Sequence, residues 1–202
     1  MSTPYAAVDA ARLPALINGR DAPIWWGIVG LIVVESVVFS ALIASYFYLG
    51  FNQPEWPAAG VKDPGLLLPG IGTAALLLSS VSMHFADSSI KKDDERRLLI
   101  GLVTSVLLAG VFLALKAVEY SDKDFRWDSH SYGSIVWLVI FFHSTHVVSL
   151  LLKTVVVALL AWRGFFDKRN RIAVTVNGFY WHFVVAVWVP LFATLYLSPR
   201  LG

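Results

Sequence analysis

No cysteine occurs among the 202 residues of the chain. Disulfides and iron–sulfur clusters require thiol or thiolate groups, and so do thiolate-bound metals and cysteine nucleophiles. The sequence therefore excludes all four. Any site in this chain has to be built from other side chains.

Charged residues are also scarce, because Asp, Glu, Lys and Arg together make up 15% of the chain while hydrophobic residues make up 57%. A soluble domain carries about 25% charged and about 45–50% apolar residues. The mean hydropathy of +0.66 agrees with this imbalance and indicates an integral membrane protein. The net charge of +2 is too small to attract a polyanion, so no nucleic-acid partner is expected.

The hydrophobic residues are gathered in long stretches. A helix needs about 20 apolar residues to cross about 30 Å of hydrocarbon, whereas the strands of a membrane barrel alternate in polarity over about 10 residues. The stretches here are continuous, so we predict an all-α, polytopic membrane bundle of about five transmembrane helices. They lie near residues 24–49, 66–86, 98–120, 132–162 and 172–197, in a transmembrane domain at 23–202 that follows an amino-terminal tail at 1–22.

Positive charge is uneven between the connecting segments. Cytoplasmic loops of membrane proteins carry an excess of Lys and Arg, so the two most basic links are expected on the cytoplasmic side. The amino terminus is then cytoplasmic and the carboxyl terminus periplasmic. The basic residues are Lys91, Lys92, Arg96 and Arg97 after the second segment, and Arg163, Lys168, Arg169 and Arg171 after the fourth.

Glu35 is an acid in the middle of the first apolar segment. It lies about 11 residues from the inner end, which places it about 16 Å deep in a helix. An ionised, unpaired acid costs several kcal/mol there, so Glu35 is expected to be protonated, paired, or turned toward protein or water. A functional role is one interpretation, and a protonated carboxyl that links two helices is the other.

Three histidines occupy similar depths. His143 and His146 are three residues apart on one face of the fourth segment, and His182 lies about 15 Å into the last one. These imidazoles could converge with Glu35. Histidine and carboxylate often bind transition metals together, but the H-x-x-H pair lacks the glutamate of H-E-x-x-H, and no E-x-x-H repeat is present. We therefore predict no metal, and imidazoles that are hydrogen-bonded to neighbouring helices.

Small residues let membrane helices approach closely, so stripes of them predict helix contacts. Lysines near the ends of apolar segments can extend to the membrane surface. We expect this of Lys116, paired with Glu119, and of Lys153. The two predicted contact stripes are Ser36, Ser40 and Ala44 in the first segment, and Gly72, Ala75, Ser79, Ser82 and Ala86 in the second.

Several short motifs, in this order and spacing, resemble subunit III of the haem-copper oxidases in its five-helix bacterial form. The resemblance runs from about Glu35 to Tyr196. Singly, none of the motifs is specific. They are Glu35-x-x-x-Phe39, Ser79-Ser80 with His84, Glu119-Tyr120, Tyr132-Gly133-Ser134, Phe142-His143-x-x-His146-Val147, and Tyr180-Trp181-His182-Phe183.

The resemblance implies a non-redox subunit of an aa3-type cytochrome c oxidase in a bacterial inner membrane, which reduces O2 to water and pumps protons. Such a chain has no catalytic residue and binds no haem or copper, which belong to oxidase subunits I and II. It packs on subunit I, binds phospholipid, supports proton uptake and can join a respiratory supercomplex. Glu35 matches the family's buried acid, and Arg163 matches an arginine that contacts a lipid headgroup.

Some family positions differ here. Val185 replaces an aspartate, Thr175 a glutamate and Lys116 a glutamine, while Ser144 and Thr145 replace Gly-Leu. The sequence leaves three alternatives open. They are the related subunit of a quinol oxidase or nitric oxide reductase, a proton-coupled transporter that uses Glu35, and a freestanding metalloenzyme on the histidines.

Overall fold

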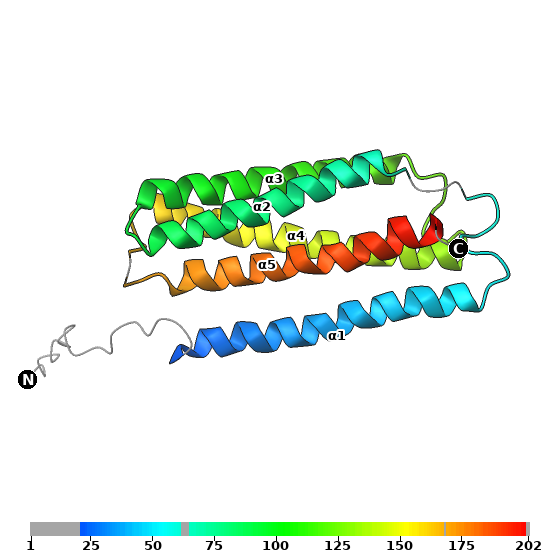
Figure 1. Ribbon diagram of the computed structural model, residues 1–202, viewed down its shortest axis with the longest axis horizontal. Coiled ribbons are helices and arrows are strands. Elements are labelled where there is room, and N and C mark those ends of the chain that lie inside the picture. Colours follow the sequence, from blue (N-terminus) through cyan, green and yellow to red (C-terminus); the bar gives the residue numbers. More distant parts are fainter. Residues whose placement is uncertain (1–20, 62–64, 168, 201–202) are drawn as a thin grey trace, which may run out of the picture.

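The computed structural model describes residues 21–61, 65–167 and 169–200. These residues form helices and contain no strand, and five of the helices are long and apolar enough to cross a membrane (Figure 1). The predicted all-α bundle of five such helices is confirmed. The expected tail at 1–22 lies almost wholly outside the described residues. The helices are α1 (Pro23–Phe51), α2 (Leu67–Ile90), α3 (Glu95–Ser121), α4 (Ser131–Trp162) and α5 (Ile172–Phe192), and α5 continues as the π-helix η3 (Ala193–Leu197) and the 3-10 turn η4 (Ser198–Arg200).

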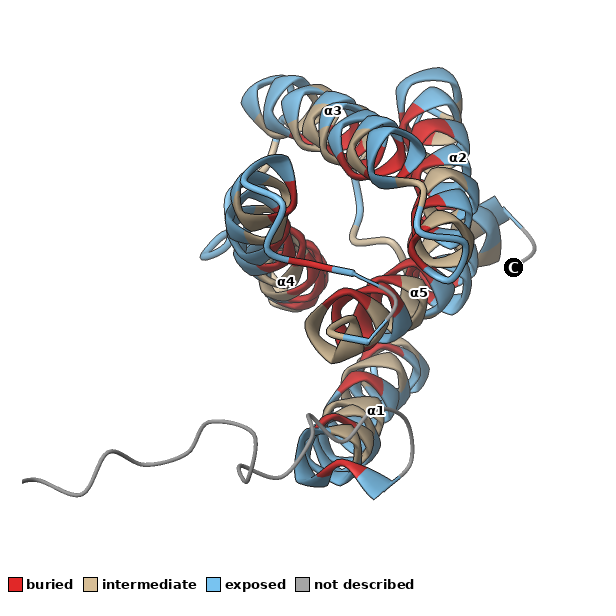
Figure 2. Cartoon of the chain, turned by 90° about the vertical axis from the view of Figure 1, so that its left-hand side faces the viewer, coloured by how far each residue is buried: buried red, intermediate tan, exposed pale blue. Residues whose placement is uncertain are grey.

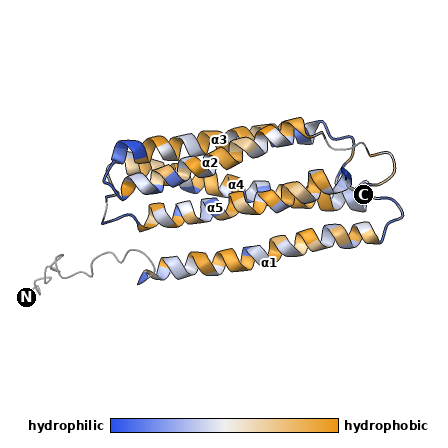
Figure 3. Cartoon of the chain, in the orientation of Figure 1, coloured by the Kyte–Doolittle hydropathy of each residue, from blue (hydrophilic) through white to orange (hydrophobic). Residues whose placement is uncertain are grey.

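Helices α2 to α5 form a ring, and α1 lies outside it against α4 and α5 (Figure 2). Hydrophobic residues cover the helices, and hydrophilic ones gather toward their ends (Figure 3). The α2–α3 and α4–α5 links lie at the end where α1 begins, and η4 lies at the other (Figure 1). We name the first the basic end after its residues Lys91, Lys92, Arg96, Arg97, Arg163, Arg169 and Arg171, and the second the opposite end.

Two helix ends extend beyond the apolar runs that predicted them. Helix α2 continues to Ile90 rather than ending near residue 86, and Lys91, its C-cap residue, forms an ion pair with Asp87 one turn earlier, at 2.5 Å. Helix α3 begins before residue 98, because the Asp94 side chain caps it and accepts from the Arg97 backbone nitrogen at 3.0 Å. Both helices therefore extend into polar sequence that hydropathy does not assign to a membrane span.

The small residues of α2 pack against α3, as predicted. The Ser105 hydroxyl donates to the Ser79 carbonyl oxygen at 3.1 Å, and the Ser82 hydroxyl donates to the Gly101 carbonyl oxygen at 3.0 Å. A Cβ atom on Gly101 would lie 2.9 Å from the Cβ of Ala86 and 3.0 Å from its backbone nitrogen. The two backbones therefore approach as closely as glycine allows.

We expect Gly101→Ala to destabilise the chain by about 1–3 kcal/mol, because the added methyl group overpacks a rigid backbone contact. Gly110 of the same helix is the matched control, since a Cβ there would meet nothing within 4 Å. Gly110→Ala should be neutral or stabilising by up to about 1 kcal/mol, as for glycine elsewhere in helices. Denaturant titration of the two variants in detergent measures both effects, and equal changes would contradict the close approach of α2 and α3.

The small-residue stripe predicted for α1 is wrong as a contact face, because Ser40 and Ala44 are exposed. Helix α1 instead turns Ile28, Phe39 and Tyr46 inward, and these are its buried residues. The Phe39 ring packs against the Phe142 and His146 rings of α4. Large side chains therefore supply the buried contacts of α1, and of the predicted stripe only Ser36 is half-buried.

Candidate functional site

Glu35 joins three helices near the middle of the bundle. The Tyr180 hydroxyl of α5 donates to the Glu35 carboxyl group, at 2.9 Å from Oε1 and 2.8 Å from Oε2. The Nε2 atom of His146 in α4 lies 3.6 Å from Oε1 of the same group. The side chains of Glu35 and His146 are only 14% and 15% exposed, so the surroundings screen this contact weakly.

The hydrogen bond at the other ring nitrogen of His146 determines which nitrogen faces Glu35. Nδ1 lies 2.7 Å from the carbonyl oxygen of Phe142, which can only accept, so Nδ1 carries a proton. Nε2 is therefore the ring nitrogen that faces Glu35 across the interface between α1 and α4.

His143 lies one turn from His146 and is completely buried. Its Nε2 atom is 3.4 Å from the Val184 carbonyl oxygen of α5, while its Nδ1 atom is buried with no partner among the described residues. The rings of Phe112 and Trp188 lie 5.9 Å and 4.8 Å from its own. The predicted hydrogen bond to a neighbouring helix is present here, whereas His146 bonds to a carbonyl of its own helix.

His182 does not converge with Glu35, so that expectation is wrong. Its Nδ1 atom lies 2.6 Å from the Ser80 hydroxyl of α2, and its ring lies 6.3 Å from that of His84. Residues two apart on a helix are separated by about 200° around its axis. Tyr180 and His182 therefore face opposite sides of α5, and Tyr180 is the partner of Glu35 that the sequence analysis missed.

Lys153 does not extend straight to the membrane surface as expected. Its Nζ atom lies over the Tyr180 ring, 4.5 Å from the ring centre. It also lines a groove of about 520 Å³ between α1, α4 and α5, whose other polar lining residue is Asn177. The lysine thus extends the polar contacts around Glu35 toward the basic end.

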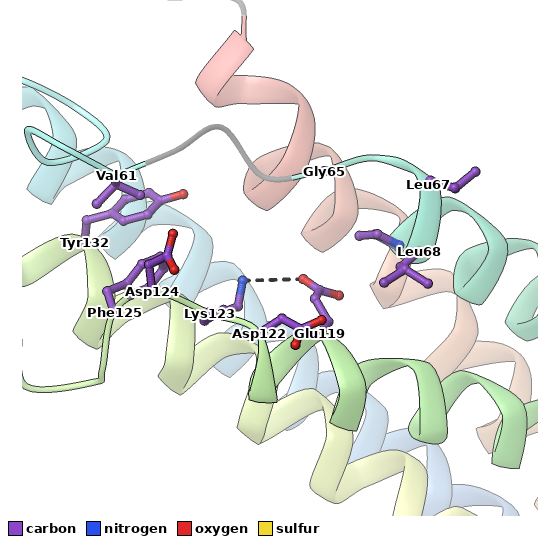
Figure 4. Close-up of a pocket in the computed structure, with 11 residues that line it drawn as sticks. Val61, Gly65, Leu67, Leu68, Glu119, Asp122, Lys123, Asp124, Phe125 and Tyr132 are labelled. Atoms are coloured by element: carbon purple, nitrogen blue, oxygen red, sulfur yellow. Dashed lines mark hydrogen bonds and ion pairs between the residues drawn. The ribbon is translucent and has the colours of Figure 1, made fainter.

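A second polar cluster lies toward the opposite end. The Lys116 ammonium donates to Glu119 Oε2 at 2.6 Å and to the Tyr196 hydroxyl at 2.7 Å, and that hydroxyl donates to Glu119 Oε1 at 2.5 Å. The predicted pairing of Lys116 with Glu119 is confirmed. Lys116 is nevertheless 2% exposed, so it is buried and does not extend to the surface. Glu119 and Lys123 line a pocket of about 560 Å³ next to this cluster (Figure 4).

His143 is enclosed by aromatic rings, and one ring nitrogen each of His146 and His182 lies within hydrogen-bond distance of a protein group. Across residues 21–61, 65–167 and 169–200, no group of three or more His, Cys, Asp or Glu residues is arranged to bind a metal ion. Arg163 is the exposed C-cap residue of α4 at the basic end.

Comparison with known proteins identifies the family. The family model described as cytochrome c oxidase subunit III matches residues 18–199. Cytochrome c oxidase subunit 3 of Synechocystis sp. is 30% identical over 176 residues, which cover 85% of this chain and 74% of that relative. The subunit 3 of Thermostichus vulcanus is also 30% identical, over 86% of this chain and 87% of the relative. The motifs, the five membrane-spanning helices and these matches agree, and the chain belongs to the cytochrome c oxidase subunit III family.

Proposed function

We propose that the chain is the non-redox subunit III of a respiratory terminal oxidase that passes electrons from cytochrome c to O2. Haem and copper reside in partner subunits I and II, which carry out the chemistry. The contact of Glu35 with Tyr180 and His146 carries the proposal for this chain, because it links three helices at one point. Its role is to hold the shape that the partner subunits require.

The physical reason lies in the position of α1 outside the ring. Apolar contact alone gives a membrane helix no preference for protein over lipid. A carboxyl group that would be unsatisfied in hydrocarbon does give such a preference, because leaving it without partners costs about 1–3 kcal/mol. Glu35 therefore selects the position and rotation of α1 against α4 and α5.

We further propose the orientation and lipid contacts of the subunit. The clustering of basic residues supports a basic end that faces the cytoplasm of a bacterial cell, with the tail at 1–22 on the same side and the domain at 23–202 in the inner membrane. Arg163 is exposed at that level and can bind a phospholipid phosphate through two guanidinium N–H groups. Sustained proton uptake by the oxidase is then an indirect effect of this shape.

Affinity purification of the tagged chain from its native membrane tests the proposal. We expect subunits with haem and copper to co-purify, together with oxidation of reduced cytochrome c coupled to O2 consumption. The chain separated from that complex should show no haem absorbance. A chain that purifies without any haem-containing partner would contradict the proposal, and a complex that oxidises quinol but not cytochrome c would contradict its electron donor.

A further inference from the structure

A row of polar side chains runs along the seam between α2 and α5 on the outer surface of the bundle. Ser80, His84 and Asp87 share one face of α2, and Thr175 and His182 share one face of α5. Ser80 lies 2.6 Å from His182, and the Thr175 hydroxyl donates to Asp87 at 2.9 Å. We call these five residues the α2–α5 polar stripe.

The stripe is incompletely paired at its centre. The His84 side chain is exposed, and within the described parts of the chain its ring has no hydrogen-bond partner, while the ring of His182 lies 6.3 Å away. His84 lies about 9 Å along the helix axis from Ile90. Helix α2 is about 36 Å long and the hydrocarbon layer about 30 Å thick, so an untilted helix centred in that layer places His84 about 6 Å inside it.

An exposed imidazole at this depth would face hydrocarbon if nothing covered it. Polar side chains within membranes almost always face protein or water, because lipid chains offer no hydrogen bonds. Helix α1 does not cover the seam, since it packs on α4 and α5 (Figure 2). The part of the chain that the structure describes therefore supplies no partner for His84.

The seam between α3 and α4, across the ring, has the opposite character (Figure 2). Two adjoining grooves of about 270 and 530 Å³ run along it and share Val106, Leu107 and Val155. Every residue that lines them is apolar. The others are Leu99, Val103, Ala158, Leu159 and Trp162 in the first groove, and Gly110, Val111, Ala114, Leu151 and Leu152 in the second.

We infer that the α2–α5 surface is the one that docks on another integral membrane subunit of the oxidase. The partner presents a transmembrane helix with a hydrogen-bonding side chain at the depth of His84, whose ring offers both a donor and an acceptor. The α3–α4 surface then faces lipid chains. This inference rests on the proposed function, and it adds which face of the chain meets its neighbour.

The absence of native cysteine makes single-cysteine labelling specific for this chain. Leu77→Cys tests the docking side, because Leu77 is 44% exposed and lies one turn from Ser80. Val103→Cys is the matched control in an α3–α4 groove, at 43% exposure. Each variant is treated with N-ethylmaleimide, in the purified oxidase and in the chain separated from it.

We expect the Leu77→Cys thiol to react at least about tenfold more slowly in the complex than in the separated chain, since the cores of protein interfaces pack as densely as protein interiors. The Val103→Cys thiol should react at rates within about twofold of each other in the two states. Equal rates for Leu77→Cys, or protection of Val103→Cys alone, would overturn the inference. A chain that has no oxidase partner would instead fail the purification above.

His84→Leu separates docking from a merely structural role. His84 makes no hydrogen bond within the described chain, so the separated variant should unfold at the same denaturant concentration as its parent. Docking predicts that the variant is lost from the complex several-fold faster during detergent washing, because the partner's polar group is left unpaired. Unchanged retention would contradict the contact at His84.

Discussion

Lys116→Met is expected to lower the free energy of unfolding of the chain by about 3–5 kcal/mol, because it leaves a buried carboxylate without its main partner. The Lys116 ammonium donates to both Glu119 and Tyr196, and it lies 4.8 Å from the Trp188 ring centre. Methionine restores the volume but neither the charge nor the hydrogen bonds. Denaturant titration in detergent, followed by tryptophan fluorescence, measures the loss.

Two controls determine whether the charge is the cause. In Lys116→Met combined with Glu119→Gln both charges are absent, and most of the lost stability should return, because a neutral buried pair carries no desolvated ion. Lys123→Met removes a lysine that is 3.4 Å from the same acid, compared with 2.6 Å for Lys116, and should cost less. A single Lys116→Met variant as stable as its parent would refute the structural role of the cluster.

Glu35→Ala is expected to destabilise the chain by about 1–3 kcal/mol for each group that it leaves unpaired. Tyr180 would lose the acceptor for its hydroxyl, and Nε2 of His146 would lose its neighbour. Helix α1 should then separate more readily from α4 and α5, because these are its polar links to them. The same titration measures the change.

Glu35→Gln is the matched variant, and it should be close to neutral for stability. Its amide oxygen can accept from the Tyr180 hydroxyl, and its amide nitrogen can donate to a neutral Nε2 of His146. It thereby imitates a protonated carboxyl group. A Gln variant as unstable as the Ala variant would show that a negative charge, rather than a hydrogen-bonded pair, holds α1.

Hydropathy was sufficient to predict the five helices, because a continuous apolar run of this length has no other structure in a membrane. Hydropathy was insufficient for the helix ends, because α2 and α3 extend into polar sequence around Asp87 and Asp94. The small-residue rule was right for α2 and wrong for α1, since it does not state which helix lies opposite. The packing of Phe39 against Phe142 shows that α4 is the helix opposite this part of α1.

The site was predictable in part. Depth alone indicated that Glu35 and His146 could meet, but depth does not fix rotation about the helix axis, so His182 was placed with them wrongly. Tyr180 and His182 are two residues apart, and this spacing alone places them on opposite sides of a helix. No sequence pattern predicted the hydrogen bond between Lys116 and Tyr196, because Tyr196 lies in the π-helical turn that follows α5.

The most direct test of whether Glu35 maintains shape or transfers protons is the activity of the oxidase that carries Glu35→Gln. Glutamine preserves the hydrogen bonds but cannot give up a proton, so a structural role and a proton relay predict different results. We predict haem absorbance and an initial rate of O2 reduction almost unchanged from the parent complex. Loss of the haem spectrum, or an initial rate that collapses while the complex remains assembled, would contradict the structural role.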